Sequence, residues 1–325
     1  MFFLILSYRF FKRAAILQRG CVNLKQIMGP LFLSLAATIW GGMYVASKFA
    51  FSAVPPMTML FLRYVIAGII LTGVCFGCGQ LKMTLKGWGY LAQIGAIGYF
   101  ASISAQFIGT DLANAHLGSL VTTLSPMFLS LFAVMLLKEK MTKKQLVMFA
   151  IAIVGVIIII GAPKDGESHI LGIFVLLLAA VTWGYYSVVV KQAAIYYTPL
   201  QMTTAGIWIA CFLSLPFACA QWDKWPHHVL LEPAIFFSIL YISVISTACA
   251  FFAWNIGLKL TPSHHAGLYF FLQPVVGSFF GWLFLGEKLG ISFFIGSLLI
   301  LLSVGISEYK KESPNLEIPS EKTSL

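Results

Sequence analysis

The chain contains one stretch of sequence twice, and this duplication constrains its fold more than any other feature. Pro126 lies 13 residues before Glu139, and Pro274 lies 13 residues before Glu287. A Trp-Gly pair followed by a lysine recurs as well, as Trp40-Gly41 with Lys48 and as Trp183-Gly184 with Lys191. The offset is 148 residues for the prolines and 143 for the tryptophans. An internal repeat of roughly 140 residues therefore sets the architecture.

The composition places both copies in a lipid bilayer. Hydrophobic residues make up 59% of the 325 residues and charged residues only 10%, whereas a soluble domain carries about 25% charged residues. Because a spanning helix needs about 20 mostly apolar residues, the apolar runs predict ten transmembrane helices. These cover 30–50, 57–77, 87–108, 115–137 and 145–162 in the first copy, and 169–191, 200–220, 234–258, 265–285 and 291–307 in the second.

The apolar runs also define the predicted domains. One five-helix repeat covers 30–162 and the other covers 169–307. For the basic segment 1–29 two interpretations are open: a helix lying on the inner membrane surface, or an extension upstream of a true start at Met28. The tail, 308–325, is polar with two prolines, which predicts disorder.

The distribution of Lys and Arg predicts the orientation. With both termini in the cytoplasm, the inner side receives 15 of these residues and the outer side four, as expected for cytoplasmic loops. Five helices per copy is an odd number, so the second copy enters the membrane from the opposite side. We therefore predict an all-α integral membrane protein of the cell (inner) membrane, with two inverted five-helix repeats around a central cavity. Inverted repeats are typical of secondary transporters.

Several aromatic and polar side chains within the apolar runs are candidates for binding a substrate. They are Trp40, Tyr44, Lys48, Arg63, Trp183, Lys191, Asn255 and Gln273. In each repeat the tryptophan and the lysine share one helix face, which predicts a cationic and aromatic wall for an anionic or zwitterionic solute. Alternatively, both lysines reach the lipid headgroups. Asn255 and Gln273 suit hydrogen bonds either to the substrate or between helices.

Arg63 is expected about two turns inside the second helix. A charge at that depth usually faces a cavity or a partner, although a side chain reaching to the interface is the alternative. A carboxylate of the substrate, Asp111 and water are the candidate partners. The guanidinium grips a carboxylate with two bonds, a geometry that lysine cannot copy.

Pro126 and Pro274 are expected to kink their helices. Each proline removes one backbone hydrogen bond and frees the carbonyl four residues earlier, at Thr122 and Phe270. The kinks either face the substrate or serve packing, and their recurrence in both repeats favours the first interpretation.

Three other patterns have simpler meanings. Glu139 and Glu287 border basic residues at helix ends, where ion pairs in tight turns are expected. Gly277 and Gly281 form a GxxxG pattern, which lets two helices approach closely and suggests a homodimer contact. A single Cys-X-X-Cys pair without a second pair does not predict a metal site.

Other classes of function fit less well. An intramembrane enzyme would need paired carboxylates, a zinc motif or an activated serine within the helices, and the sequence carries neither an HExxH motif nor a P-loop. A channel does not require inverted repeats, and a sensor would usually carry a sizeable soluble domain. The net charge of +10 does not predict nucleic-acid binding, because the basic residues cluster at the ends of the apolar runs.

Taken together, several motifs resemble those of the drug/metabolite transporter superfamily, and within it the EamA family. They are Trp40-Gly41, Arg63-Tyr64, the two prolines, and the turns at Glu139 and Glu287. The resemblance covers residues 30 to 307. It implies ten helices around a central cavity, cytoplasmic termini and export of amino acids or related metabolites, although the family also contains importers and exchangers. The first copy departs from the pattern at Lys138, where the second has Gly286.

We therefore expect a secondary transporter, not an enzyme, that moves a small polar metabolite by alternating access. Amino-acid efflux is favoured, and import or exchange of another metabolite is the alternative. The expected partners are a small-molecule substrate and the lipid bilayer, with no nucleic acid and no cofactor.

Overall fold

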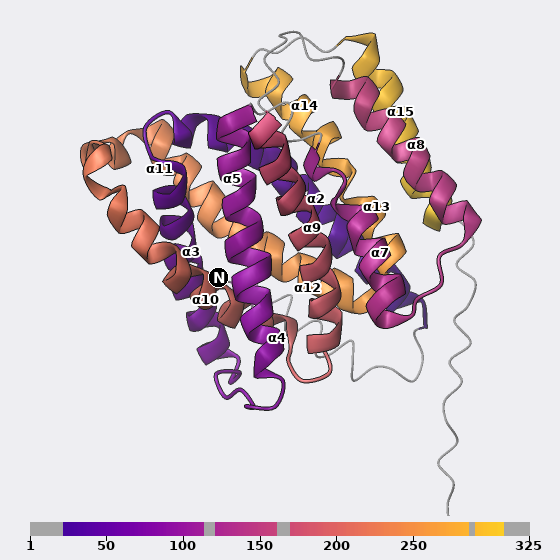
Figure 1. Ribbon diagram of the computed structural model, residues 1–325, viewed down its shortest axis with the longest axis horizontal. Helices are drawn as coiled ribbons and strands as arrows, with labels where there is room; N and C mark the ends of the chain where they lie inside the picture. Colours follow the sequence, from indigo (N-terminus) through magenta and orange to yellow (C-terminus); the bar gives the residue numbers. More distant parts are fainter. Residues whose placement is uncertain (1–21, 114–120, 161–169, 286–289, 309–325) are drawn as a thin grey trace, which may run out of the picture.

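The described part of the chain is helical throughout. The computed structural model describes residues 22–113, 121–160, 170–285 and 290–308, except for some side chains within helices, among them those of Tyr44, Lys48 and Asp111. Over these residues there is no strand (Figure 1). The apolar composition explains why, because a helix satisfies its backbone N–H and C=O groups internally, as a lipid environment requires.

The helices follow the predicted runs closely. In the first repeat they are α2 (Val22–Phe51), α3 (Pro56–Gly77), the continuous segment of α4 (Trp88–Gln93), η1 (Ile94–Ala101) and α5 (Ser102–Ala113), then α7 (Ser125–Leu137) and α8 (Lys143–Ile160). In the second they are α9 (Ile170–Ala193), α10 (Pro199–Ala220), η2 (Trp222–Lys224), η3 (His227–Leu231), α11 (Pro233–Leu240), η4 (Tyr241–Cys249), α12 (Ala250–Leu260), α13 (Ser263–Tyr269), α14 (Leu272–Leu285) and α15 (Ile291–Glu308).

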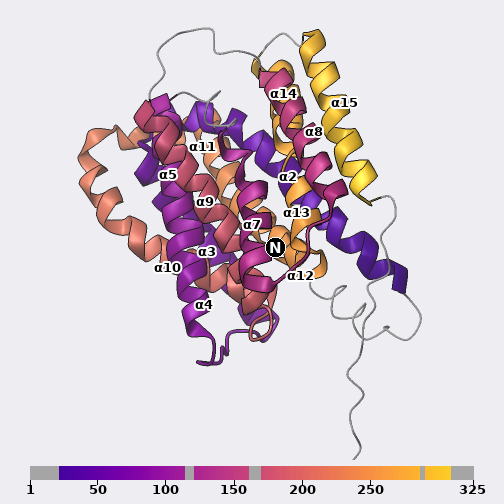
Figure 2. The ribbon, with the colours of Figure 1, turned by 45° about the vertical axis from the view of Figure 1, so that its right-hand side comes forward.

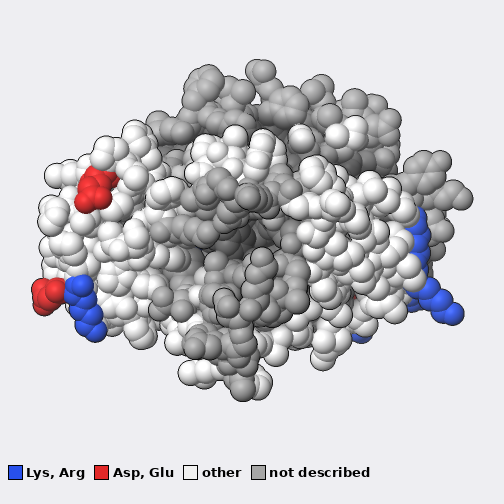
Figure 3. Space-filling view, turned by 90° about the horizontal axis from the view of Figure 1, so that it is seen from above, with Lys and Arg blue, Asp and Glu red and all other residues white. Residues whose placement is uncertain are grey.

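The described residues contain seven helical segments that are long and apolar enough to cross a membrane. They are Ile27–Phe51, Pro56–Gly77, Trp88–Thr110, Leu171–Ala193, Pro199–Ala220, Pro233–Leu260 and Ser263–Phe284. Seen from above, the few described charged side chains lie toward the edges of the surface (Figure 3). A multi-pass membrane protein is thus confirmed, whereas the count of ten spans and the inverted relation stay predictions.

Two π-helical segments interrupt the third and eighth predicted spans at corresponding places. The segments η1 and η4 begin 147 residues apart and end 148 residues apart, close to the offset of the prolines. The wide turns of a π-helix are rare and often occur at functional sites. The hydrophobic pattern did not predict them.

The two helices that carry the repeated prolines are broken, not merely kinked. The chain leaves the helix at 123–124, just before α7, and at 270–271, between α13 and α14. Pro126 therefore lies in the first turn of α7, where the missing N–H would have no helical partner in any case. Pro274 is the third residue of α14.

The carbonyls expected to be free are bonded locally instead. The hydroxyl of Ser125 donates to the carbonyl of Thr122 at 2.6 Å. The backbone N–H of Gln273 donates to the carbonyl of Phe270 at 3.1 Å. The breaks thus satisfy their own polar groups, which the simple kink model did not anticipate.

The helices fall into a central group and a margin. In both views α8 and α15 lie side by side at one margin, while α2, α7, α9, α12 and α13 occupy the middle (Figures 1 and 2). Residues of both repeats meet in this central group, and the candidate site is built there.

Candidate functional site

The tryptophans at corresponding positions of the two repeats touch each other in the centre of the molecule. The ring centroids of Trp40 on α2 and Trp183 on α9 lie 5.4 Å apart with an interplanar angle of 82°. Both side chains are buried. Edge-to-face contact is a favoured arrangement for aromatic pairs, so the repeated tryptophans form one contact between the repeats.

Three further rings surround Trp40, and the sequence singled out none of these rings, although it pointed to the backbone carbonyl of Phe270. Their centroids lie 5.3 to 6.1 Å from the Trp40 ring, and they belong to Phe251, Trp254 and Phe270. The first two follow η4 on α12, and Phe270 stands at the break between α13 and α14. An apolar residue in an apolar run gives no signal of this kind, which is why the pattern missed them.

A cavity of about 30 Å³ lies against this aromatic cluster. It is lined by Trp40, Met43, Arg63, Ser102, Ile103, Gln106, Thr122 and Ser125 from the first repeat, and by Ala179, Trp183, Phe251, Phe270 and Gln273 from the second. The volume accommodates a couple of water molecules. In this conformation the space between the repeats is too small for an amino acid.

Arg63 is enclosed by protein at the edge of the cavity. Its side chain is 1% exposed, and its Nε donates to Oγ1 of Thr247 at 2.8 Å. The guanidinium carbon lies 5.5 to 5.6 Å from the centroids of three rings, those of Tyr64, Phe107 and Phe251. Among the described residues no carboxylate lies within ion-pair distance of it. Arg63 is therefore buried inside the protein, and its side chain does not reach out to the lipid headgroups.

Trp40, Trp183 and Gln273 line the cavity and differ in whether their buried N–H donors have a partner in the described part of the chain. Nε1 of Trp40 donates to the carbonyl of Ser246, in η4, at 3.0 Å. Nε1 of Trp183, by contrast, has no hydrogen-bond acceptor among the residues that the structure describes, and neither does Nε2 of Gln273. The two tryptophans are therefore equivalent in sequence but not in their hydrogen bonding.

Asn255 belongs to a separate network that joins helices. Its Oδ1 accepts from the hydroxyl of Tyr186 at 2.7 Å. Its Nδ2 donates to the hydroxyl of Tyr99 at 3.0 Å and to Oγ1 of Thr203 at 2.9 Å. The side chain does not line the cavity, and these contacts match the helix-to-helix alternative. Its role in binding a substrate stays a prediction.

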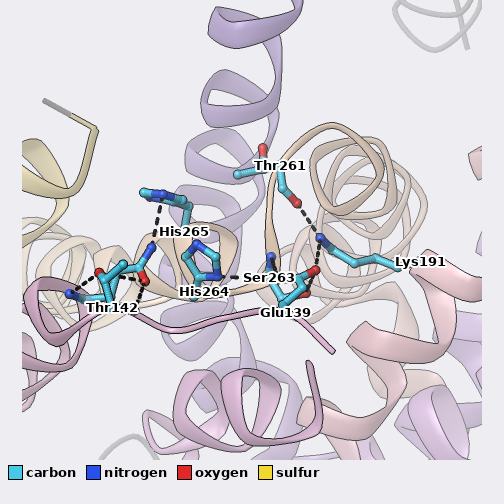
Figure 4. A network of polar contacts seen from close by, with 8 residues as sticks. Glu139, Thr142, Lys191, Thr261, Ser263, His264 and His265 are labelled. Atoms are coloured by element: carbon cyan, nitrogen blue, oxygen red, sulfur yellow. Dashed lines mark hydrogen bonds and ion pairs between the residues drawn. The ribbon is translucent and has the colours of Figure 1, made fainter. Parts of the chain in front are cut away.

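Lys191 lies away from Trp183, at the end of α9. Its Nζ is 3.3 Å from Oε1 of Glu139 and donates to the carbonyl of Thr261 at 2.6 Å. Glu139 also accepts from the backbone N–H of Ser263 at 2.9 Å and from its hydroxyl at 3.0 Å. Nδ1 of His264 completes the cluster, 3.4 Å from Oε2 (Figure 4). Trp183 lines the cavity and Lys191 lies in this cluster, and a joint wall of the two for a solute stays a prediction.

The surroundings of Glu139 favour its charged form. Burial raises the pKa of the carboxyl, but the contacts from His264, Lys191 and Ser263 outweigh it and lower the pKa from 4.5 to about 2. The glutamate was expected to pair within its own turn. It pairs instead with residues of the second repeat.

Several predicted residues lie outside this description. The side chains of Tyr44 and Lys48 are not among the described ones, and neither is any part of Glu287. Gly277 lies in α14, as does Gly281, and the homodimer contact through them stays a prediction.

Both halves of the chain match one known family. The model of the EamA-like transporter family matches the chain twice, over residues 27–161 and 170–308. The chain belongs to the EamA-like transporter family. Trp40 therefore belongs to the first EamA repeat and Trp183 to the second.

Individual relatives agree with this assignment. An uncharacterized transporter of Bacillus subtilis (strain 168), YetK, is 25% identical over 316 residues, which cover 94% of each chain. An uncharacterized transporter of Archaeoglobus fulgidus is 24% identical over 86% of this chain and 99% of its own. A solved crystal structure superposes with a TM-score of 0.70 at 20% identity, over 86% of this chain and 96% of that one. The similarity to this solved structure shows the fold alone. The EamA repeats and these relatives identify a membrane transporter and not an enzyme.

Proposed function

We propose that this EamA protein is a secondary transporter that exports amino acids or related small polar metabolites across the cell membrane by alternating access. The observation that carries the proposal is the narrow cavity of about 30 Å³ where Trp40 and Trp183 meet. A cavity lined by both repeats is what a transport cycle between inverted repeats requires.

The helix breaks supply places where the molecule can change shape. Ser125 at the first break and Phe270 at the second both line the cavity. A break in a helix lets the two parts reorient without disrupting a continuous hydrogen-bond ladder. Movement at these two points would widen the cavity toward one end or the other.

The predicted substrate-binding residues divide into three groups. Trp40, Arg63, Trp183 and Gln273 line the cavity and are proposed to contact the solute. Asn255 and Lys191 are bonded elsewhere, and Tyr44 and Lys48 stay proposals from the sequence. Export of amino acids is supported by the family resemblance, and import or exchange is the alternative for the same site.

Transport into proteoliposomes tests the proposal. We expect the purified protein to accumulate labelled L-amino acids by exchange against an internal unlabelled pool. Trp183→Ala should lower the initial rate by roughly tenfold or more, because large aromatic anchors dominate binding energy. The matched control is Trp88→Ala, whose side chain is 46% exposed and should leave the rate unchanged. If no amino acid of the panel moves, or if Trp183→Ala transports like the parent, the proposal is wrong in substrate or in site, respectively.

A further inference from the structure

Three side chains that line the cavity, those of Arg63, Trp183 and Gln273, carry N–H donors. We infer that the cavity recognises a carboxylate of the solute through Arg63, Trp183 and Gln273, an inference that rests on the proposed transport function. It deepens that function by assigning the chemical group that is bound and the atoms that bind it.

The three residues together offer what a carboxylate needs. Arg63 gives one of its five N–H donors to Thr247, and among the described residues its Nη1 reaches the sulfur of Met43, at 4.0 Å. Nε1 of Trp183 and Nε2 of Gln273 are buried and have no acceptor in the described part of the molecule. Buried donors without partners are costly, so a ligand that accepts from them gains binding energy.

Two hydroxyls that line the cavity donate within the protein. The hydroxyl of Ser102 donates to the carbonyl of Ala179 at 2.9 Å, and the hydroxyl of Ser125 donates to the carbonyl of Thr122. No Asp or Glu lines the cavity among the described residues. The rings of Phe251 and Phe270 offer apolar surface for the rest of the solute.

Matched ligands test the inference on the intact protein. Substrate-induced thermal stabilisation would be measured for L-leucine against 3-methylbutylamine and for L-phenylalanine against 2-phenylethylamine. Each amine lacks only the carboxylate. We expect the acids to stabilise the parent and the amines to bind roughly tenfold more weakly or worse, since bonds to charged groups are the strong ones.

Variants of the protein show which side chains donate to the carboxylate of the ligand. Arg63→Lys keeps the charge but not the two-pronged geometry and should lose most of the acid-dependent shift. Gln273→Leu should lose part of it, while Trp88→Ala serves as the control. If acid and amine stabilise the parent equally, carboxylate recognition is wrong although transport stands. If neither ligand binds nor is transported, the proposed substrate class fails as well.

A second inference comes from a different set of residues. We propose that the cluster around Glu139 closes the transport path at the end of the molecule where α7 ends. Glu139 belongs to the first EamA repeat, whereas Lys191, Ser263 and His264 belong to the second. Every contact to this carboxylate therefore crosses between the repeats (Figure 4).

Two short helices connect this cluster to the cavity. α7 begins at Ser125, which lines the cavity, and Glu139 follows its last turn. α13 begins at Ser263 and ends just before Phe270, which also lines the cavity. A shift of either helix at its break would therefore move one side of the cluster, so that a solute in the cavity and the cluster influence each other.

The sequence repeats the ionisable members of the cluster. Lys191, His264 and Glu139 have counterparts in Lys48, His116 and Glu287, at offsets of 143, 148 and 148 residues. The side chains of these counterparts are not described by the structure. The recurrence shows that the three residue types belong to the repeated unit and are not a chance surface pairing.

Accessibility from each side of the membrane tests the closure. Ile103, which lines the cavity, would be changed to cysteine in a variant whose six native cysteines are replaced. We expect Glu139→Gln to raise the labelling rate by a membrane-impermeant maleimide, applied from the side on which α7 ends, by roughly fivefold or more. The control is Glu232→Gln, which removes an exposed carboxylate and should change nothing.

A double variant separates closure from general loss of folding. If Glu139 and Lys191 act together, Glu139→Gln with Lys191→Met should label no faster than Glu139→Gln alone. A second test links Glu139→Cys to Ser263→Cys with a reducible crosslinker, which should stop transport until the link is cut. Unchanged labelling in Glu139→Gln, or full transport by the crosslinked protein, would overturn the proposal.

Discussion

Gly184 of α9 lies so close to Phe128 of α7 that a Cβ at position 184 would be 2.6 Å from the Phe128 Cβ. Gly41 of α2 has the same relation to Val276 of α14, at 2.7 Å. Val276 follows Phe128 by 148 residues, the offset of the prolines. The first helix of each repeat therefore packs against the proline-bearing helix of the other, and glycine permits that close approach. This reciprocal packing explains why Trp-Gly occurs twice.

The first prediction concerns this packing. A Cβ at Gly184 would also lie 2.6 Å from the backbone nitrogen of Leu129, which cannot move aside as a flexible side chain can. We expect Gly184→Ala to destabilise the protein by about 1–3 kcal/mol, measured as a lower Tm in detergent. Gly73→Ala is the control, because no atom lies within 4 Å of a Cβ there. An equal Tm for both variants would contradict the packing argument.

The sequence predicted the helices well and the central contacts only in part. Predicted and observed ends of α3, α9 and α10 agree within about two residues, because long apolar runs leave few alternatives. The tryptophans were found by their repetition. Phe251 was missed because an apolar residue among apolar residues carries no signal.

Other features needed three-dimensional context. The π-helical turns have no distinct residue pattern, so η1 and η4 could not be predicted from periodicity. The pairing of Glu139 with Lys191 joins residues 52 positions apart, which only the packing of α7 against α9 brings together. Arg63 lies about two turns into α3, as predicted, but its cage of rings was not foreseeable from spacing.

The second prediction concerns the prolines. Because Pro126 and Pro274 stand at helix breaks beside the cavity, replacing either by alanine would favour a continuous helix. We expect Pro126→Ala and Pro274→Ala to reduce transport several-fold more than they reduce the amount of folded protein. Pro216→Ala is the control, since Pro216 lies on the exposed side of the unbroken α10. If both variants transport at the rate of the parent protein, the helix breaks serve packing and not transport.

The third prediction concerns topology. In Figure 1 α4 begins at the lower end of the molecule, and the segment that joins α10 to α11 lies at the upper end. Lys86 precedes α4, and Asp223 lies in η2 within that joining segment. From the bias of basic residues we expect Lys86→Cys to be labelled from the cytoplasmic side and Asp223→Cys from the outside. Labelling of both positions from the same side would contradict the predicted orientation.

The fourth prediction concerns the turn after α7. Lys138 has φ 56° and is the one described non-glycine residue with a positive φ. Its counterpart in the second repeat is Gly286. Because a left-handed conformation costs an L-residue about 1–2 kcal/mol, Lys138→Gly should raise the Tm. Lys140→Gly, at an exposed position without positive φ, should not. If Lys138→Gly lowers the Tm, the lysine side chain itself stabilises the folded protein.

The last prediction concerns the pH dependence of the Glu139 cluster. The pKa of this carboxyl is lowered from 4.5 to about 2, so its contribution to closure is fully present above about 4.5 and is lost as the pH falls toward 2. Lys140, Lys191, Lys259 and His264 are the other titratable groups at this site.

Because only the thiolate of a cysteine reacts with a maleimide, the labelling rate of the Ile103→Cys protein is divided at each pH by that of an exposed reference cysteine. We expect this ratio, measured from the side on which α7 ends, to stay constant as the pH falls from about 8 to about 5, and to rise only below about 4.5. His264→Asn would separate the carboxylate from the imidazole, because any change that persists in this variant cannot come from the histidine. A rise in labelling near neutral pH that persists in His264→Asn would show that Glu139 is protonated far more readily than its contacts with Lys191 and Ser263 allow.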